Sequence, residues 1–336
     1  MQKRNQKLID AIIEKAHRDC PGSLALIGIY GSFLTGDIHE KSDLDLLILI
    51  NDDRGYSLAH TFILEDEAIG HDLYCTTWEM LESDAKFTHP HISKLMDSRI
   101  VYCADESYLT RLEELRFQAM TVDTRQAADA VLAEAERSFA KAMLATETSD
   151  IRFWAGNMMY QTMGAVALLN HRYFKMGTRR VFEEIEAMER KPQNLRALAD
   201  AFLDAESATD MKAALSHLLG AVEALFTEPL PCPEVFPGTY EEMFSNWRNK
   251  MYYAAETGDK YLAFDSMCGL DNMLKELGFP MDVLGRFDPN DLIASAKAYD
   301  DILEAYRKEY DRAGIQVQSY PDVDAFIETY IKKETA

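Results

Sequence analysis

The sequence IYGSF at residues 29–33 is followed by KSDLDLLI at residues 41–48. The first segment closes one short apolar run and the second opens another. Short apolar runs bounded by turn residues are typical of buried β-strands. We therefore expect a strand that ends in Gly-Ser, ten intervening residues at 33–42, and an Asp-x-Asp that opens the next strand.

This pairing predicts a site for a metal and a nucleoside triphosphate. Asp43 and Asp45 would point to the same face of their strand, about 6.6–6.8 Å apart along it. Two such carboxylates repel each other unless a cation offsets the repulsion, and Mg²⁺ prefers oxygen ligands and bridges phosphates. Gly31 permits close backbone approach, while Ser32 offers a hydroxyl at a strand-to-helix corner whose following amides suit phosphate.

Outside this motif, strand signals are confined to the first third of the chain and helical signals dominate the rest. Further strands are expected at 69–76 and 98–103, whereas 56–64 is ambiguous between strand and helix. Thr76 and Glu79 have the spacing of a capping box, which predicts a helix from Thr77. Helices are expected before the motif, with Pro21-Gly22 as the stop signal, and at 107–119, 123–147, 150–175, 179–190, 192–205, 208–226, 240–256, 259–277, 290–310 and 321–333. Asp150 is the expected N-cap of the helix at 150–175, and a strand is expected at 314–318.

These signals predict an α+β fold, in which an α/β domain with a small mixed β-sheet precedes a mostly α-helical region. We place a catalytic domain at 1–112, a helical acceptor-binding domain at 113–228, and a C-terminal helical subdomain at 240–336. The connector at 229–239 holds four of the ten prolines in the chain, which excludes a helix there.

Charge narrows the range of partners. The chain of 336 residues has 35 basic and 57 acidic side chains and a net charge of −22. DNA, RNA and anionic membranes are polyanions, so none of them is expected to bind this acidic chain. No apolar run is long enough to span a bilayer. The N-terminus lacks a signal-peptide pattern and the five cysteines form no CxxC pair, which together predict a cytoplasmic protein.

The pattern GS-x10-DxD resembles the signature of the DNA polymerase β-like nucleotidyltransferase superfamily. Within it, the chain is similar to kanamycin and lincosamide nucleotidyltransferases and to bacterial minimal nucleotidyltransferases, over roughly residues 22–104. The resemblance implies that Asp43 and Asp45 bind the metal on the triphosphate. It also implies a third carboxylate on a neighbouring strand, and Asp72 in GHDLY is the best match. The rivals are Glu65, Asp66, Glu67 and Glu79.

The remaining implied roles concern phosphate. Gly31 and Ser32 would contact the terminal phosphates, and Lys41 and Ser42 are further nucleotide-binding candidates. Asp72 would activate the attacking hydroxyl, either as a base or through a second metal. The resemblance therefore implies a Mg²⁺-dependent transfer of a nucleoside monophosphate, AMP from ATP, to a hydroxyl of a small molecule such as an aminoglycoside-like antibiotic, with release of pyrophosphate.

Two alternatives remain open: a protein adenylyltransferase of the antitoxin type, and a non-catalytic nucleotide-binding protein. A homodimer is compatible with the sequence. The stretch 150–175, which includes Tyr160 and Lys175, either lines a pocket or is simply core. Arg248 and Lys250 either contact nucleotide or are solvated on a helix in which Trp247 and Met251 pack; we favour the solvated alternative.

Overall fold

The two apolar runs beside the Gly-Ser and Asp-x-Asp segments form the two central strands of a small sheet. In the computed structural model, β1 (Leu24–Ile29) pairs antiparallel with β2 (Leu46–Ile50), and every residue of both strands is buried. The sheet has the order β5-β2-β1-β6, in which β6 (Arg99–Cys103) is antiparallel to β1 and β5 (Cys75–Thr77) is parallel to β2. The structure describes residues 2–36, 44–65, 68–227 and 232–331.

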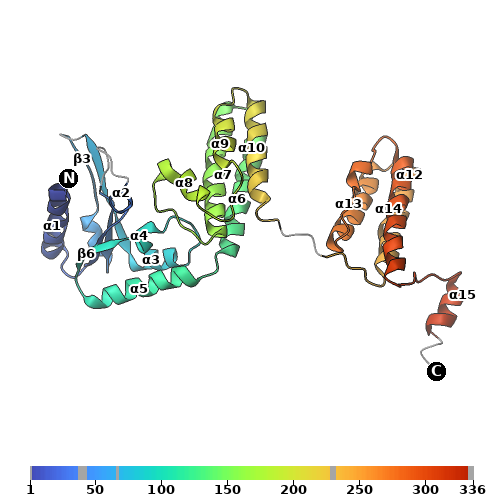
Figure 1. Cartoon of the computed structure of the whole chain (residues 1–336), viewed down its shortest axis with the longest axis horizontal. Helices are drawn as coiled ribbons and strands as arrows, with labels where there is room; N and C mark the ends of the chain where they lie inside the picture. Colours follow the sequence, from blue (N-terminus) through green and yellow to red (C-terminus); the bar gives the residue numbers. More distant parts are fainter. Residues whose placement is uncertain (1, 37–43, 66–67, 228–231, 332–336) are drawn as a thin grey trace. The chain divides into compact units, whose positions relative to one another are not determined.

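Helices cover both faces of this sheet because alternate residues of the strands point to opposite sides. Leu46, Ile48 and Ile50 pack in one core with the apolar face of α1 (Gln2–Asp19). Leu47 and Leu49 pack in a second core with α3 (Trp78–Ala85), α4 (Ser93–Met96) and α5 (Glu106–Thr121). A small mixed sheet followed by helices confirms the predicted fold class (Figure 1).

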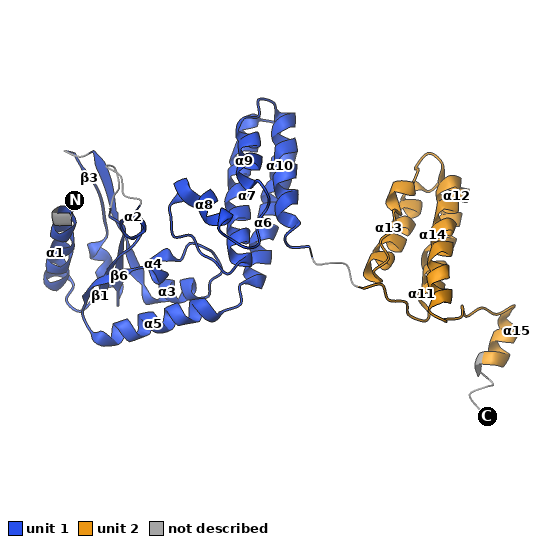
Figure 2. Ribbon diagram, in the orientation of Figure 1, with its two compact units in different colours: residues 1–227 blue, residues 228–336 orange. Residues whose placement is uncertain are grey.

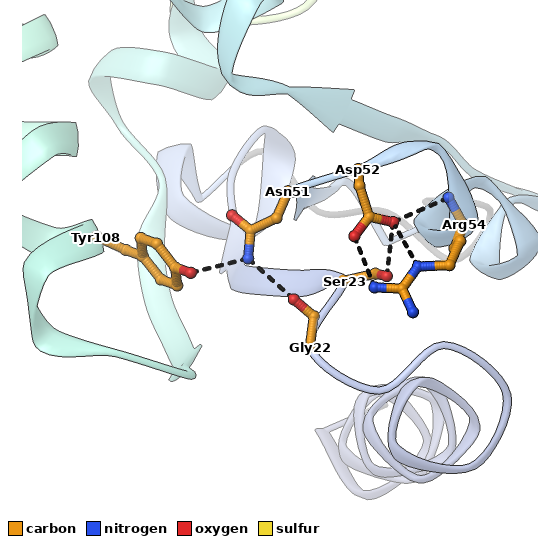
Figure 3. Close-up of polar contacts among 6 residues, drawn as sticks. All are labelled: Gly22, Ser23, Asn51, Asp52, Arg54 and Tyr108. Carbon is orange, nitrogen blue, oxygen red and sulfur yellow. Dashed lines mark hydrogen bonds and ion pairs between the residues drawn. The ribbon is translucent and has the colours of Figure 1, made fainter.

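A polar cluster joins the N-terminal end of β1 to the C-terminal end of β2. Asn51 Nδ2 donates to the carbonyl of Gly22 at 3.1 Å and to the hydroxyl of Tyr108 at 2.9 Å. Asp52 accepts from Ser23 and from Arg54, and these hydrogen bonds, led by that of Arg54, lower its pKa from the usual 3.8 to about 2. Figure 3 shows the six residues of this terminal clamp: Gly22, Ser23, Asn51, Asp52, Arg54 and Tyr108. The clamp holds the end of the strands opposite to Gly31 and Asp45.

The strand predicted at 69–76 is broken into two strands that belong to different sheets. β4 (Ile69–Leu73) pairs antiparallel with β3 (His60–Leu64), and β5 resumes after Tyr74 beside β2. The ambiguous stretch before it divides into a 3₁₀ helix η1 (Asp53–Leu58) and β3. Thr77, one residue after the predicted cap, caps α3 by accepting from Met80 N.

The helical part of the first unit continues from α5 into a second core. α6 (Arg125–Leu144) and α7 (Thr148–Leu169) pack with α9 (Leu195–Leu203) and α10 (Ala208–Glu223), and η2 (Thr178–Arg180) and α8 (Val181–Glu186) lie between α7 and α9 in the chain. Two predictions are wrong here. α7 ends at Leu169 rather than at residue 175, and Glu147 rather than Asp150 occupies its N-cap position.

The second unit follows Thr227 and has its own core (Figure 2). α11 (Thr239–Met243), a π-helical turn η3 (Phe244–Arg248) and α12 (Asn249–Thr257) run consecutively and pack with α13 (Lys260–Glu276) and α14 (Leu292–Arg312). The short η4 (Leu284–Arg286) precedes α14, and α15 (Val323–Phe326) and η5 (Ile327–Ile331) follow it. The strand predicted at 314–318 is wrong, because these residues have no regular secondary structure.

The prediction that Arg248 is solvated is wrong. Its guanidinium is not simply solvated, because Nε and Nη2 donate to the two carboxylate oxygens of Asp300 at 2.6 and 3.0 Å. Met251 is buried, and the indole of Trp247 lies against Gly269, where a Cβ would be 2.3 Å from Nε1.

Candidate active site

The backbone brings the Gly-Ser corner and the second aspartate of Asp-x-Asp together. Tyr30 N, just after β1, donates to Asp45 O, just before β2, at 3.2 Å. Gly31 has φ 70° and ψ −147°, a conformation that side chains with a Cβ rarely adopt. A Cβ built on Gly31 would lie 2.1 Å from Oδ2 of Asp45. Glycine is therefore required here twice, by its backbone angles and by the carboxylate packed against it.

Ser32 opens a single helical turn, α2 (Ser32–Thr35), which follows Gly31 as the sequence predicts. Leu34 N donates to Gly31 O at 2.9 Å, and the turn ends at Gly36, whose φ is 76°. Ser32 is half-buried at this corner, on the same chain segment as the close approach to Asp45. Three other predicted site residues lie outside the described residues: Lys41, Ser42 and Asp43.

Asp72 lies on β4, the strand that leads into the parallel neighbour of β2. Ile48 pairs with Cys75, and counting three residues back along each chain leads to Asp45 and Asp72. Regular pairing does not extend that far, because β5 begins at Cys75. Asp72 is exposed and accepts a hydrogen bond from Thr61 Oγ1 at 2.9 Å. Its position on β4, three residues before β5 begins, is compatible with the predicted third carboxylate, and that role stays a prediction.

The rival carboxylates lie in other settings. Glu65 is exposed in the turn after β3, and Glu79 is exposed in the first turn of α3. Asp66 and Glu67 lie outside the described residues.

A cavity of about 350 Å³ opens beside the Gly-Ser corner. Its lining combines this corner with residues from two distant parts of the chain: Gly31, Leu34, Thr35, Asp97, Lys175 and Met176. The size falls within the range of small-molecule sites. The helical region therefore contributes a cation, Lys175, to a pocket of the sheet domain.

The position of Lys175 is defined by contacts of its backbone and its ammonium group. Its own N–H and that of Met176 both donate to the carboxylate of Glu184, each at 2.8 Å. Its Nζ lies 3.8 Å from Oδ1 of Asp97, which also accepts from Tyr173 OH at 2.8 Å. Burial, and then this hydrogen bond, raise the pKa of Tyr173, so the phenol remains a donor at neutral pH.

Sequence reasoning named Lys175 only as one residue of a presumed long helix, and it missed Asp97, Tyr173 and Glu184. Lys175 lies six residues beyond the end of α7, in a segment without regular secondary structure. Because no periodic pattern links such a segment to a strand corner about 140 residues earlier in the sequence, residue spacing carries no signal for this pocket.

The donors present fit a hard divalent cation in their chemistry. Asp45 offers a carboxylate, the ligand type that Mg²⁺ prefers, directly against a glycine that leaves room for it. Within residues 2–36, 44–65, 68–227 and 232–331, no group of three or more His, Cys, Asp or Glu side chains could by itself hold a metal. Asp43 is not among these residues.

Comparison with known proteins agrees with this geometry. Residues 9–102 match the family model of the nucleotidyltransferase domain. The first third of the chain is therefore similar to nucleotidyltransferase domains. The match runs from α1 to β6 and includes Gly31, Ser32, Asp45 and Asp72.

The other comparisons add little. A crystal structure of a nucleotidyltransferase-like protein from Exiguobacterium sibiricum is similar over 81% of this chain and 91% of that chain, with 12% identity and a TM-score of 0.37, which is too low to support a conclusion. No curated protein matches the chain. Among the described helices, none has the length and apolar character needed to cross a lipid bilayer.

Proposed function

We propose that the protein transfers AMP from ATP to a hydroxyl group of a small molecule and releases pyrophosphate, with Mg²⁺ as the cofactor. The observation that carries the proposal is the contact of Asp45 with Gly31 at the edge of a pocket that also contains Lys175. The match of residues 9–102 to the nucleotidyltransferase domain supports this reading of the pocket. Aminoglycoside-like antibiotics are one candidate class of acceptor.

Asp45, together with Asp43 and Asp72, would hold the metal. When bound there, Mg²⁺ would offset the negative charge of the triphosphate and of the leaving pyrophosphate. The buried pairing of β2 with β1 on one side and β5 on the other fixes the position from which Asp45 acts.

The protein's own groups would orient the phosphates and accept the proton of the attacking hydroxyl. Ser32, with Lys41 and Ser42, would contact the β- and γ-phosphates, and Lys175, which lines the same pocket, would add a positive charge. The acceptor oxygen would form a bond to the α-phosphorus while the bond to the β-phosphate oxygen breaks. The hydroxyl proton would pass to Asp72, directly or with the help of a second metal.

The test is transfer of radiolabelled α-phosphate from each nucleoside triphosphate to a panel of hydroxylated small molecules, including aminoglycosides and lincosamides. We expect ATP to be the preferred donor and Asp45→Asn to abolish transfer without altering the circular dichroism spectrum. Asp53→Asn is the matched control, because Asp53 is an exposed aspartate in η1, beyond the other end of β2. Turnover by Asp45→Asn at the wild-type rate would contradict the metal assignment. Undetectable binding of Mg-ATP by calorimetry would contradict the transferase proposal, whereas binding of Mg-ATP without transfer to any acceptor would favour a non-catalytic nucleotide-binding role.

A further inference from the structure

The pocket at the Gly-Ser corner contains a carboxylate beside its lysine. Asp97 and Lys175 both line the cavity of about 350 Å³ next to Gly31. Lys175 Nζ lies 3.8 Å from Oδ1 of Asp97, which is close enough for an ion pair and too long for a hydrogen bond. The attraction by Asp97 therefore does not use the N–H donors of the ammonium group, and these donors can bind a ligand in the pocket.

The position of the Asp97 carboxylate is fixed by its surroundings. Asp97 directly follows α4, and Arg116 donates to the carbonyl oxygens of Leu95 and Ser98 at 2.8 and 2.6 Å. These two carbonyls lie just before and just after Asp97 in the chain. The hydroxyl of Tyr173 donates to Oδ1 of Asp97 at 2.8 Å, and the side chain of Asp97 is only 27% exposed. The carboxylate is therefore a fixed part of the pocket wall.

The ammonium group of Lys175 has more freedom than the carboxylate. The backbone of Lys175 is held, because its N–H and that of Met176 donate to Glu184 at 2.8 Å. The side chain of Lys175 is 53% exposed and carries its charge on a flexible four-carbon stem. The ammonium group can therefore turn from Asp97 to a phosphate while its backbone stays in place.

The charges in this part of the pocket work against tight binding of an anion. Asp97 and Lys175 together have no net charge, and Asp45 adds a carboxylate against Gly31 at the same corner. An anion that approaches Lys175 has to replace the attraction of this lysine for Asp97. Asp97 therefore lowers the affinity that Lys175 alone would give the pocket for phosphate groups.

An ion pair in the second unit shows how a pair that serves stability differs. Lys275 Nζ donates to Oδ2 of Asp271 at 2.6 Å, and Asp271 is buried. The two residues are one turn apart on α13 and support the same helix. Asp97 and Lys175 come instead from distant segments of the chain, lack a hydrogen bond to each other and meet in a cavity.

We propose that Asp97 competes with phosphate groups for Lys175 and that this competition promotes the release of pyrophosphate after transfer. When the triphosphate binds, the ammonium group turns to its phosphate oxygens, and Asp97 keeps the hydrogen bond from Tyr173. After transfer, Asp97 attracts Lys175 away from pyrophosphate. The competition follows from the contacts in the pocket, whereas its effect on pyrophosphate rests on the proposed function.

The experiment measures the binding of inorganic pyrophosphate with Mg²⁺ to the full-length protein by titration calorimetry. We expect Asp97→Asn to bind pyrophosphate about fivefold more tightly than the wild type, because the competing charge is removed and Lys175 remains. The amide oxygen of Asn still accepts from Tyr173, so the fold should be kept. Lys175→Ala should weaken binding, and in that background Asp97→Asn should change the affinity less than about twofold.

Asp271→Asn is the matched control, because it also removes the carboxylate of an aspartate–lysine pair and should leave the affinity for pyrophosphate unchanged. Weaker or unchanged binding by Asp97→Asn would overturn the proposal, since a carboxylate that only supports the structure would give this result. Equal tightening with and without Lys175 would also overturn it, because Asp97 would then repel the anion directly.

The outcomes for the competition and for the transferase are separable. Undetectable binding of pyrophosphate by both the wild type and Asp97→Asn would refute the competition, even if nucleotide transfer from ATP is observed. The expected tightening in Asp97→Asn without transfer to any acceptor would refute the transferase proposal and leave the competition for Lys175 as a property of an anion site.

Discussion

Gly31→Ala tests whether the contact between the Gly-Ser corner and Asp45 is needed. The added methyl group has two consequences that can be separated. It places a Cβ on a residue with φ 70° and ψ −147°, which costs about 1–3 kcal/mol in backbone strain. It also meets Oδ2 of Asp45 at 2.1 Å, so the carboxylate must move by 0.9 Å or more to restore the shortest acceptable separation of 3.0 Å.

The displacement should affect activity more than stability. A shift of about 1 Å in a positioned group can lower a rate about 100-fold. We therefore expect Gly31→Ala to lower the free energy of unfolding, measured by urea denaturation, and to reduce nucleotide transfer by about that factor. Gly22→Ala provides the control, because Gly22 has φ 80° but no atom within 4 Å of its added Cβ. It should lose stability and keep its activity.

A double mutant tests the contact between Gly31 and Asp45 through its effect on stability, without an assay of transfer. In an Asp45→Ala background the contacts with the carboxylate are removed and only the Cβ of residue 45 remains close, at 3.1 Å, so Gly31→Ala should lower the free energy of unfolding by less than it does in the wild type. If the cost is the same in both backgrounds, or if Gly31→Ala retains full turnover, the carboxylate does not depend on this glycine.

Three further predictions concern other parts of the protein. Lys175→Ala should raise the KM for the nucleotide several-fold in steady-state kinetics, and rescue of binding by Lys175→Arg would support a role for charge. Arg54 lowers the pKa of Asp52 to about 2, so the stabilisation by this carboxylate is complete above the usual pKa of 3.8 and is lost as the pH falls toward 2. Asp52→Asn should therefore make the urea midpoint of unfolding depend less on pH between 3.8 and 2. An unchanged pH dependence would contradict this. Gly269→Ala should destabilise the second unit by about 1–3 kcal/mol in thermal unfolding, because the methyl group would meet the indole of Trp247 at 2.3 Å, and an unchanged melting temperature would show that the indole moves freely.

The fold was predictable where hydrophobic pattern alone determines an element. The runs that form β1 and β2 are apolar at successive positions, so both faces of each strand are apolar. Such a run is expected of a strand that is covered on both sides. The break at Tyr74 was not predictable, because the alternation of buried and exposed residues in β4 continues toward β5 without a glycine or proline to mark the bend. The position of the cap at Thr77 was missed by one residue, since adjacent threonines give the same local signal.

Only those site residues that belong to one local sequence motif could be predicted. Gly31, Ser32 and Asp45 belong to one motif, and the structure brings Gly31 and Asp45 together as the motif suggests. The environment of Lys175 depends on contacts with Asp97 and Glu184 that link separate segments, and no local pattern reports such pairs. The same limit applies to Arg248 and Asp300, which are 52 residues apart.

β2 has a consequence for how such a protein can change over generations. The residue proposed to bind metal is attached to a strand that is buried throughout and paired on both sides, so most substitutions there would destabilise the domain. Lys175, which is proposed to contact the triphosphate, is an exposed side chain outside any helix or strand, where substitutions seldom affect folding. Affinity for the proposed nucleotide can therefore diverge through substitutions in the pocket lining, while the strand that carries Asp45 changes little.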